Sequence, residues 1–521
     1  MQFRHITLLA GLCLLCACGT RTEPEAENNP PALLSTDPAD GVTDVMGSSL
    51  SVTFTFDQNI KCSPEWMSKI SVSGEAVIDK VEAYGTWLTV WVGSLAKGTS
   101  YTVSLPAGTV QGYRKNQKGS APISFTFTTW KDDTPVSPGR MKPAKDEAGW
   151  ENAALCLKNM GVGWNLGNTL DSNSGSLDNM WIEAWTKRTP TDYETAWGQP
   201  VATRELIHMF KEAGFNSIRV PVTWYPHIGK IEVSIQTIEG ESKGVWDPST
   251  WSGYDVDPAW MARVKEVVDY VIDEGMYCIL NVHHDTGAES AAWLRAEAAA
   301  YSASRERYIK LWEQIATTFA SYGERLVFES FNEMLDTQST WNDPRDATAF
   351  DAINSYNADF VATVRATGGN NARRNLILIT YAASVSEKTL RAFKLPEDSV
   401  KDHLCAEVHS YAPYQFAMVE NTSQTKFNSS CEQEVTNIVN LVGTILVDNG
   451  IPCVIGEYGA TAGRDESERC KQATCYIKNA CRFGIPCFYW MTLSDGADRS
   501  VPKWTSTALK DAIIKAYNDY S

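Results

Sequence analysis

Residues 326–334 read L-V-F-E-S-F-N-E-M, a short run of apolar, β-branched and aromatic residues that ends in Asn332 and Glu333. Such a run predicts a buried strand. A carboxyl group at the end of that strand has no evident structural purpose. A second stretch, residues 454–460 with the sequence V-I-G-E-Y-G-A, places Glu457 in the same setting. The two stretches therefore predict parallel strands whose carboxyl ends carry a pair of glutamates.

The chain around these stretches, residues 146–521, alternates strand patterns with helical periods. Eight such units close most simply into a (β/α)8 barrel, an α/β fold. An open doubly wound sheet is the alternative, but no G-x-G-x-x-G follows the first strand. Helices are expected at 258–274, 307–322, 350–367, 432–448 and 467–483. Strands are expected at 161–167, 217–223, 277–283, 326–332, 376–381, 404–410, 453–457 and 487–493.

Residues 32–130 have a different pattern, in which short alternating strands are separated by Gly, Pro and Asp turns. This spacing predicts a small all-β sandwich, and stretches such as 35–42 (S-T-D-P-A-D-G-V) resemble bacterial immunoglobulin-like modules. We expect a spacer role for this domain; sugar binding through Trp66, Trp87 or Trp91 is the alternative. Residues 131–145 are the expected linker to the barrel. Strands are expected at 51–56, 87–92, 101–105 and 123–128.

The N-terminus has the pattern of a lipoprotein signal peptide over residues 1–17. Arg4 precedes a short apolar run, which ends in L-C-A-C with Cys18 as the expected lipidation site. Residues 18–31 are polar and Pro-rich, as in an extended tether. Since no later stretch has the roughly 20 apolar residues of a membrane helix, we expect a lipid anchor as the sole membrane contact. The expected location is the bacterial outer membrane or cell surface, with the protein a monomer.

The composition favours a neutral substrate. There are 46 basic and 63 acidic residues, for a net charge of -17, which argues against nucleic acid as a partner. The 18 Trp and 20 Tyr offer flat aromatic faces of the kind that pack on sugar rings. After Cys18 no C-x-x-C spacing occurs among the cysteines, so no cysteine zinc site is expected. We expect no metal and no cofactor.

In such barrels the active site lies at the carboxyl ends of the strands. Retaining glycoside hydrolysis needs one carboxylic acid and one carboxylate about 5 to 5.5 Å apart, and Glu333 and Glu457 are the candidates. Arg219 is a candidate to keep Glu457 ionised, Tyr411 is a candidate to donate a hydrogen bond to it, and Asn332 would hold the substrate 2-hydroxyl. The other strand ends carry Trp164, Asn168, His283, His409 and Trp490.

Several motifs carry a resemblance to glycoside hydrolase family 5 that spans nearly all of residues 150–500. Those at 161–171 and 194–200 resemble its subfamily 4, which holds endo-β-1,4-glucanases, xyloglucanases and mixed-linkage glucanases. The motifs are G-V-G-W-N-L-G-N-T-L-D at 161–171, E-T-A-W-G-Q-P at 194–200, A-G-F-N-S-I-R-V-P-V-T-W at 213–224, N-V-H-H-D at 281–285, F-N-E at 331–333, V-H-S-Y at 408–411 and I-G-E-Y-G at 455–459.

The resemblance implies a retaining endo-β-1,4-glucanase acting on a β-glucan or xyloglucan polysaccharide. Glu333 would be the acid/base and Glu457 the nucleophile. Two departures stand out: Ser410 lies where the family often has Tyr, and residues 490–496 (W-M-T-L-S-D-G) replace the common W-D or W-W-N-G types. The second departure leaves open which sugar units the substrate subsites prefer. By the resemblance the supporting shell is Asn332, Arg219, His283, His409 and Tyr411, with Trp490 as the sugar platform.

Three alternatives remain at this point. One is a β-mannan or glucomannan hydrolase of the same family, and another is a non-catalytic surface glycan-binding lipoprotein. A metal-dependent hydrolase is motivated by His283, His284, Asp285 and His409, although adjacent strand residues face opposite sides. Glu329 and Glu407 are expected to be buried, hydrogen-bonded barrel residues. Trp224, Trp293 and Trp341 are candidates either for outer subsites or for loop packing.

Overall fold

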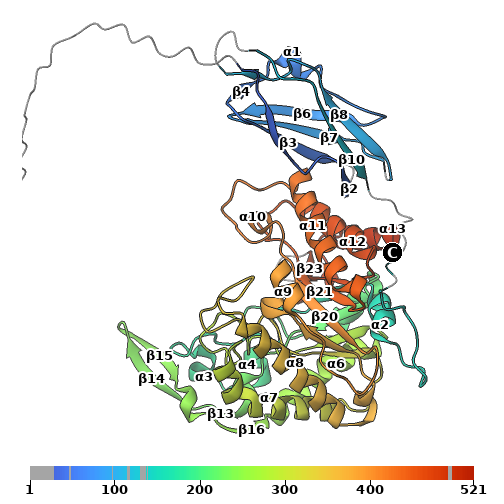
Figure 1. Ribbon diagram of the computed structural model, residues 1–521. Coiled ribbons are helices and arrows are strands. Elements are labelled where there is room, and N and C mark those ends of the chain that lie inside the picture. The colour runs from blue at the N-terminus through green and yellow to red at the C-terminus, as the bar shows by residue number, and fades with distance from the viewer. Residues whose placement is uncertain are drawn as a thin grey trace, which may run out of the picture. The chain divides into compact units, whose positions relative to one another are not determined.

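The computed structural model describes residues 29–45, 49–96, 98–113, 118–129, 137, 139–490 and 496–521. The chain divides into two compact units, Met1–Asp132 and Asp133–Ser521 (Figure 1). The expected signal peptide and Cys18 lie outside the described residues. Within the described ranges, no helix is both long and apolar enough to cross a membrane.

The first unit is a sandwich of two four-stranded sheets, which confirms the all-β prediction. The strand orders are β1-β3-β7-β6 and β2-β10-β8-β5. Residues alternate between buried and partly exposed along β3, and its Phe54 meets Phe125 of β10 edge to face at 6.0 Å, so the inner faces of both sheets form one core. The strands are β1 Leu33–Asp37, β2 Val42–Val45, β3 Leu50–Phe56, β5 Ser71–Val72, β6 Val77–Tyr84, β7 Trp87–Gly93, β8 Ser100–Leu105 and β10 Ile123–Thr129.

The second unit contains a closed barrel of eight parallel strands, as predicted. The barrel strands follow one another around the ring in the order in which they occur along the chain, and β11 pairs with β22 to close the ring. Nearly all residues of these strands are buried, because one face of each lines the barrel interior while the other lies under helices. The strands are β11 Val162–Asn165, β12 Ser217–Val220, β17 Tyr277–Leu280, β18 Leu326–Glu329, β19 Leu376–Ile379, β20 Leu404–His409, β21 Cys453–Tyr458 and β22 Cys487–Trp490.

A helix follows every barrel strand. The five helices predicted from the sequence are present, but α7 begins nine residues before its predicted start at residue 307. The Ala-rich stretch 298–306 has few large apolar residues, so it shows no helical period. The helices are α5 Arg204–Glu212, α6 Pro258–Asp273, α7 Ala298–Thr318, α8 Thr348–Ala366, α9 Glu387–Ala392, α11 Ser429–Ile445, α12 Glu466–Cys481 and α13 Ala508–Tyr520.

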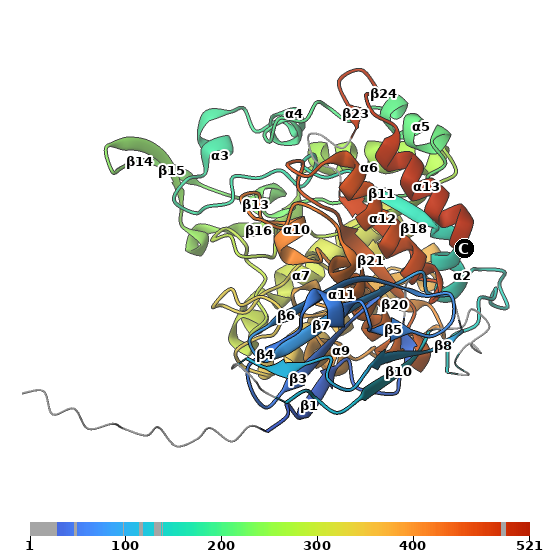
Figure 2. The same cartoon turned by 90° about the horizontal axis from the view of Figure 1, so that it is seen from above.

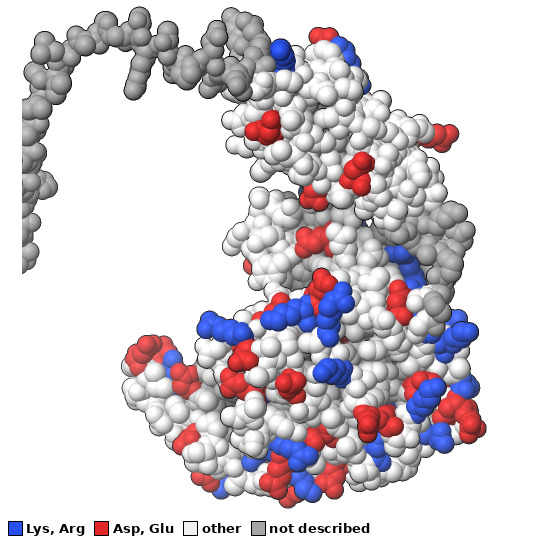
Figure 3. All heavy atoms as spheres, viewed as in Figure 1, with Lys and Arg blue, Asp and Glu red and all other residues white. Residues whose placement is uncertain are grey.

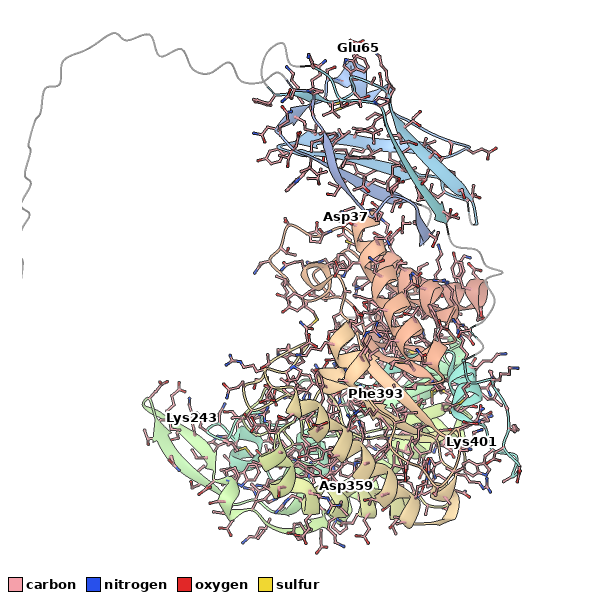
Figure 4. All side chains as sticks on the ribbon, in the orientation of Figure 1. Asp37, Glu65, Lys243, Asp359, Phe393 and Lys401 are labelled. Carbon is pink, nitrogen blue, oxygen red and sulfur yellow. The ribbon has the colours of Figure 1, made fainter. Side chains whose placement is uncertain are left out.

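The segment between β12 and α6 contains strands that lie outside the barrel. β13 (Ile228–Lys230) pairs with β16 (Ser252–Val256), and between them β14 (Val233–Ile238) and β15 (Glu241–Trp246) form a hairpin. The hairpin projects from the barrel in Figures 1 and 2, and Lys243 marks it in Figure 4. Most residues of β14 are exposed, in keeping with a hairpin that projects from the barrel.

Part of the predicted linker 131–145 belongs to the second unit. The Ser137 hydroxyl donates to the carbonyl of Asp448 at 3.1 Å, and the Arg140 guanidinium donates to the carbonyl of Arg482 at 2.9 Å. On the face of this unit shown in Figure 3, acidic and basic side chains are interspersed. Its surface charge is therefore mixed on that face.

Candidate active site

Glu333 and Glu457 meet at the carboxyl ends of the barrel strands. Glu457 lies in β21, and Glu333 follows β18 by four residues. One carboxylate oxygen of each, together with a ring nitrogen of His409, lie within 4.8 Å of one another. Retaining enzymes hold their carboxyl groups about 5 to 5.5 Å apart and inverting enzymes about 6.5 to 9.5 Å apart. An approach this close is nearer to the retaining arrangement than to the inverting one.

The two glutamates have different surroundings. The Glu333 side chain is 22% exposed and the Glu457 side chain 6%. Glu457 accepts a hydrogen bond on each oxygen, from Arg219 Nη1 to Oε1 and from Tyr411 Oη to Oε2, both at 2.8 Å. Donors on both oxygens fix the orientation of this carboxylate.

Arg219 of β12 is buried and donates hydrogen bonds to side chains at the ends of several other barrel strands. Its Nε and Nη2 each lie 2.7 Å from an oxygen of Glu329, and Nη2 also donates to Asn332 Oδ1 at 2.9 Å. Burial by itself would lower the pKa of Arg219, but the neighbouring carboxylates outweigh it and raise that pKa well above its usual value. The arginine therefore supplies a permanent positive charge beneath Glu457.

Glu329 and Glu407 are fully buried, as the sequence predicts. Asn281 Nδ2 donates to Glu329 at 2.9 Å. Glu407 Oε1 lies 3.3 Å from both Arg219 Nε and His409 Nε2. Burial and the charge of Glu329 raise the pKa of Glu407 to about 7, against the opposing effect of Arg219.

His409 at the end of β20 connects the pair. Its Nδ1 lies 2.8 Å from Glu333 Oε1 and 3.6 Å from Glu457 Oε2. Burial would lower the pKa of His409, but Glu457, Glu333 and Glu407 outweigh it and raise the pKa to about 10. At neutral pH the ring is therefore an imidazolium between carboxylates.

His283 and Trp490 stack face to face, with centroids 5.6 Å apart and planes inclined by 10°. Burial lowers the pKa of His283 well below its usual value, so its ring is neutral and Nδ1 accepts from Asn281 Nδ2 at 3.0 Å. A Cβ at Gly167 would lie 2.7 Å from the Trp490 indole, so the glycine allows the loop after β11 to approach it. Trp490 remains partly exposed at the end of β22.

The prediction that Trp164 contributes to the substrate site is wrong. Its ring is fully buried beside Phe215 and Phe210, at 5.0 and 5.4 Å, on the outer side of β11. The next residue, Asn165, faces inward instead, and its Oδ1 accepts from Arg219 Nη1 at 3.0 Å. Alternation along the strand sets these opposite directions.

Sequence reasoning assigned no role to Asn165 or Asn281, although both lie inside quoted motifs. In the structure β11 pairs with β12 so that Asn165 lies opposite Arg219, on the same side of the sheet. Asn168 has φ +57° and donates its backbone N–H to Asp171 Oδ2 at 3.0 Å, which holds the loop after β11. A side-chain role for Asn168 toward substrate stays a prediction.

Among the residues that the structure describes, two groups have ligand atoms close enough together to hold a metal ion. One is Glu333, His409 and Glu457, in which the protonated ring of His409 opposes metal binding. The other is Asp171, His283 and His284. The expectation that no metal takes part stays a prediction.

The comparisons with known proteins agree with this geometry. The family described as Cellulase (glycosyl hydrolase family 5) matches residues 182–496, and the bacterial Ig-like domain family matches residues 27–129. Endoglucanase A of Clostridium longisporum is 34% identical over 391 residues, which cover 71% of this chain and 67% of that protein.

Solved structures are also similar. A family 5 glycoside hydrolase from Prevotella bryantii B14, in complex with a xyloglucan tetradecasaccharide, has 38% identity and a TM-score of 0.61 over 71% of this chain and 99% of that one. A broad specificity endoglucanase from Ruminococcus champanellensis with bound cellotriose has 36% identity and a TM-score of 0.60, over 72% of this chain and 100% of that one. The chain therefore belongs to glycosyl hydrolase family 5, the cellulase family, and is a glycoside hydrolase with an N-terminal immunoglobulin-like domain.

Proposed function

We propose that the protein is a retaining endo-β-1,4-glucanase that hydrolyses internal bonds of cellulose-like, mixed-linkage or xyloglucan polysaccharides by double displacement. The observation that carries the proposal is the approach of Glu333 and Glu457 to within 4.8 Å, each with different partners. Two carboxyl groups at this separation, one held by fixed donors and one more exposed, suit a nucleophile and an acid/base.

In the first step Glu457 attacks the anomeric carbon. The new bond joins that carbon to a carboxylate oxygen, while the bond to the leaving oxygen breaks. Glu333 gives its proton to the leaving oxygen. His409 Nδ1 lies 2.8 Å from Glu333 Oε1, and this hydrogen bond orients the carboxyl group of Glu333 for proton transfer.

In the second step Glu333 takes a proton from water, and the water oxygen attacks the anomeric carbon. The carboxylate of Glu457 leaves and regains its hydrogen bonds to Arg219 and Tyr411. Asn332 has its Oδ1 held by Arg219, which leaves its amide N–H groups to bind the sugar 2-hydroxyl.

The stereochemistry of the product tests this mechanism. Double displacement returns a β-configured reducing end, which ¹H NMR detects before mutarotation. A first product in the α configuration would overturn the retaining mechanism. Full activity after exhaustive chelation is expected, because no step requires a metal.

The substrate range is proposed from the relatives. The structures similar to this chain include an enzyme with a bound xyloglucan oligosaccharide and a broad specificity endoglucanase with cellotriose. Product analysis on carboxymethylcellulose, barley β-glucan, xyloglucan and glucomannan tests the range. Faster turnover of glucomannan than of all three glucans would favour the mannan alternative.

We also propose that Cys18 is lipidated and anchors the protein, as a monomer, at the outer membrane or cell surface. The support is the sequence pattern of residues 1–18 alone. The Cys18→Ala variant is expected to move the protein from the membrane fraction to the soluble fraction. An unchanged membrane fraction would contradict the anchor.

A further inference from the structure

The loop that follows Glu333 presents an exposed tryptophan. Of the three tryptophans considered for outer subsites, Trp224 is fully buried and Trp293 donates its indole N–H to Asp285 at 2.6 Å. Trp341 is 49% exposed. The structure therefore leaves Trp341 with an accessible ring.

The backbone of this loop is held rigidly. The carboxylate of Asp336 accepts hydrogen bonds from the backbone N–H groups of Gln338, Thr340 and Arg345, and from the Thr340 hydroxyl. The loop thus wraps around one buried carboxylate. Few of its backbone conformations remain accessible, so a ring carried by it is pre-organised.

Both residues beside Trp341 are fixed from outside the loop. The carbonyl of Thr340 accepts from Tyr381 Oη at 2.7 Å, and the carbonyl of Asn342 accepts from Thr389 Oγ1 at 2.9 Å. Tyr381 and Thr389 belong to the segment after β19. Trp341 is therefore anchored above the β18–β19 side of the barrel.

Trp490 belongs to the opposite side. In the ring order β11-β12-β17-β18-β19-β20-β21-β22, β18 and β22 are four strands apart, which is half of an eight-stranded barrel. Function in such barrels lies over the carboxyl ends of the strands, where both tryptophans stand. The loop that carries Trp341 and the strand that carries Trp490 therefore lie on opposite sides of the barrel end that holds Glu333 and Glu457.

We propose that Trp341 is a binding platform for a glucose unit on the leaving-group side of the cleaved bond. This inference rests on the proposed endoglucanase function. The loop of Trp341 starts directly after Glu333, the group that protonates the leaving oxygen, and an aromatic face packs against the apolar face of a sugar ring.

Two substrates separate this role from catalysis itself. A soluble mixed-linkage β-glucan fills leaving-group subsites, whereas β-cellobiosyl fluoride has a single-atom leaving group and fills none. For Trp341→Ala we expect kcat/KM on the polysaccharide to fall about tenfold, and on the fluoride to change less than about twofold. Trp341→Tyr is expected to recover most of the activity on the polysaccharide.

Tyr84→Ala is the matched control, because Tyr84 is an aromatic side chain that is 80% exposed and lies in the immunoglobulin-like unit. It is expected to leave both rates on soluble substrates unchanged. Equal losses of Trp341→Ala on both substrates, or no loss on either, would overturn the platform role. If the wild-type protein turned over neither substrate, the endoglucanase function itself would have failed.

Discussion

Gly456 lies against the carboxylate of Glu407 so closely that a Cβ at position 456 would overlap Oε1 of that carboxylate. Gly456 comes directly before Glu457, at a point where the pairing of β20 with β21 shifts register. The carboxylate of Glu407 reaches both Arg219 and His409 through this space. The absence of a side chain at position 456 therefore helps to position Glu457.

Gly456→Ala is expected to displace either Glu407 or the nucleophile. A misplacement of about 1 Å lowers rates by about a hundredfold, so we expect a loss of that order in kcat/KM and a lower melting temperature. Gly323→Ala is the control, since a Cβ there meets no atom within 4 Å. Equal activity of the two variants would contradict the positioning role.

Glu457→Ala and Glu333→Ala should each reduce polysaccharide turnover by at least about a thousandfold, because each step of double displacement needs both groups. Added azide is expected to restore turnover of an activated substrate and to give the α-glycosyl azide with Glu457→Ala and the β-glycosyl azide with Glu333→Ala. Undiminished turnover in either variant would reject the assignment.

Tyr411→Phe removes the hydrogen bond to Glu457 Oε2 and leaves the ring in place. We expect kcat to fall by about ten- to a hundredfold, with a smaller change in KM, because the lost donor acts on the reacting carboxylate. Steady-state kinetics on barley β-glucan measures this. A change confined to KM would place the hydroxyl in substrate binding instead.

Glu407 should make folding stability depend on pH. Its pKa rises from 4.5 to about 7 on folding, so the folded state binds more protons between these values. The stabilisation is fully present below about pH 4.5 and is lost as the pH rises through 7, with a slope of at most about 1.4 kcal/mol per pH unit. Denaturant titrations of wild type and Glu407→Gln from pH 4 to 8 test this.

The glutamine variant keeps an oxygen for His409 and Arg219 but does not titrate, so its stability should fall less over this range. Asp171 and Asp285, each with a pKa raised to about 6 by burial, contribute changes of the same sign to both proteins. Their effect cancels in the comparison. Parallel pH profiles of the two proteins would contradict the prediction.

The sequence predicted the barrel and the glutamate pair because both depend on strong local patterns. The apolar run that ends in Asn332 and Glu333 predicts a buried strand with a carboxyl group at its end, and so does the similar run before Glu457. The side toward which Trp164 points was not predictable in this way. Residues on both faces of a parallel barrel strand are buried, so composition does not distinguish inward from outward positions, and a one-residue shift exchanges them.

The amide of Asn165 joins the first strand of the ring to the last two. Its Nδ2 donates to the carbonyl of Gly456 at 2.9 Å and lies 3.3 Å from the carbonyls of Phe488 and Tyr489. The other end of the same side chain holds Arg219. If the chain were cut between Glu333 and β19, each fragment would keep one glutamate. Turnover would then require the hydrogen bonds of Asn165 to form again between the two fragments. Such a split enzyme would report fragment complementation directly through sugar release.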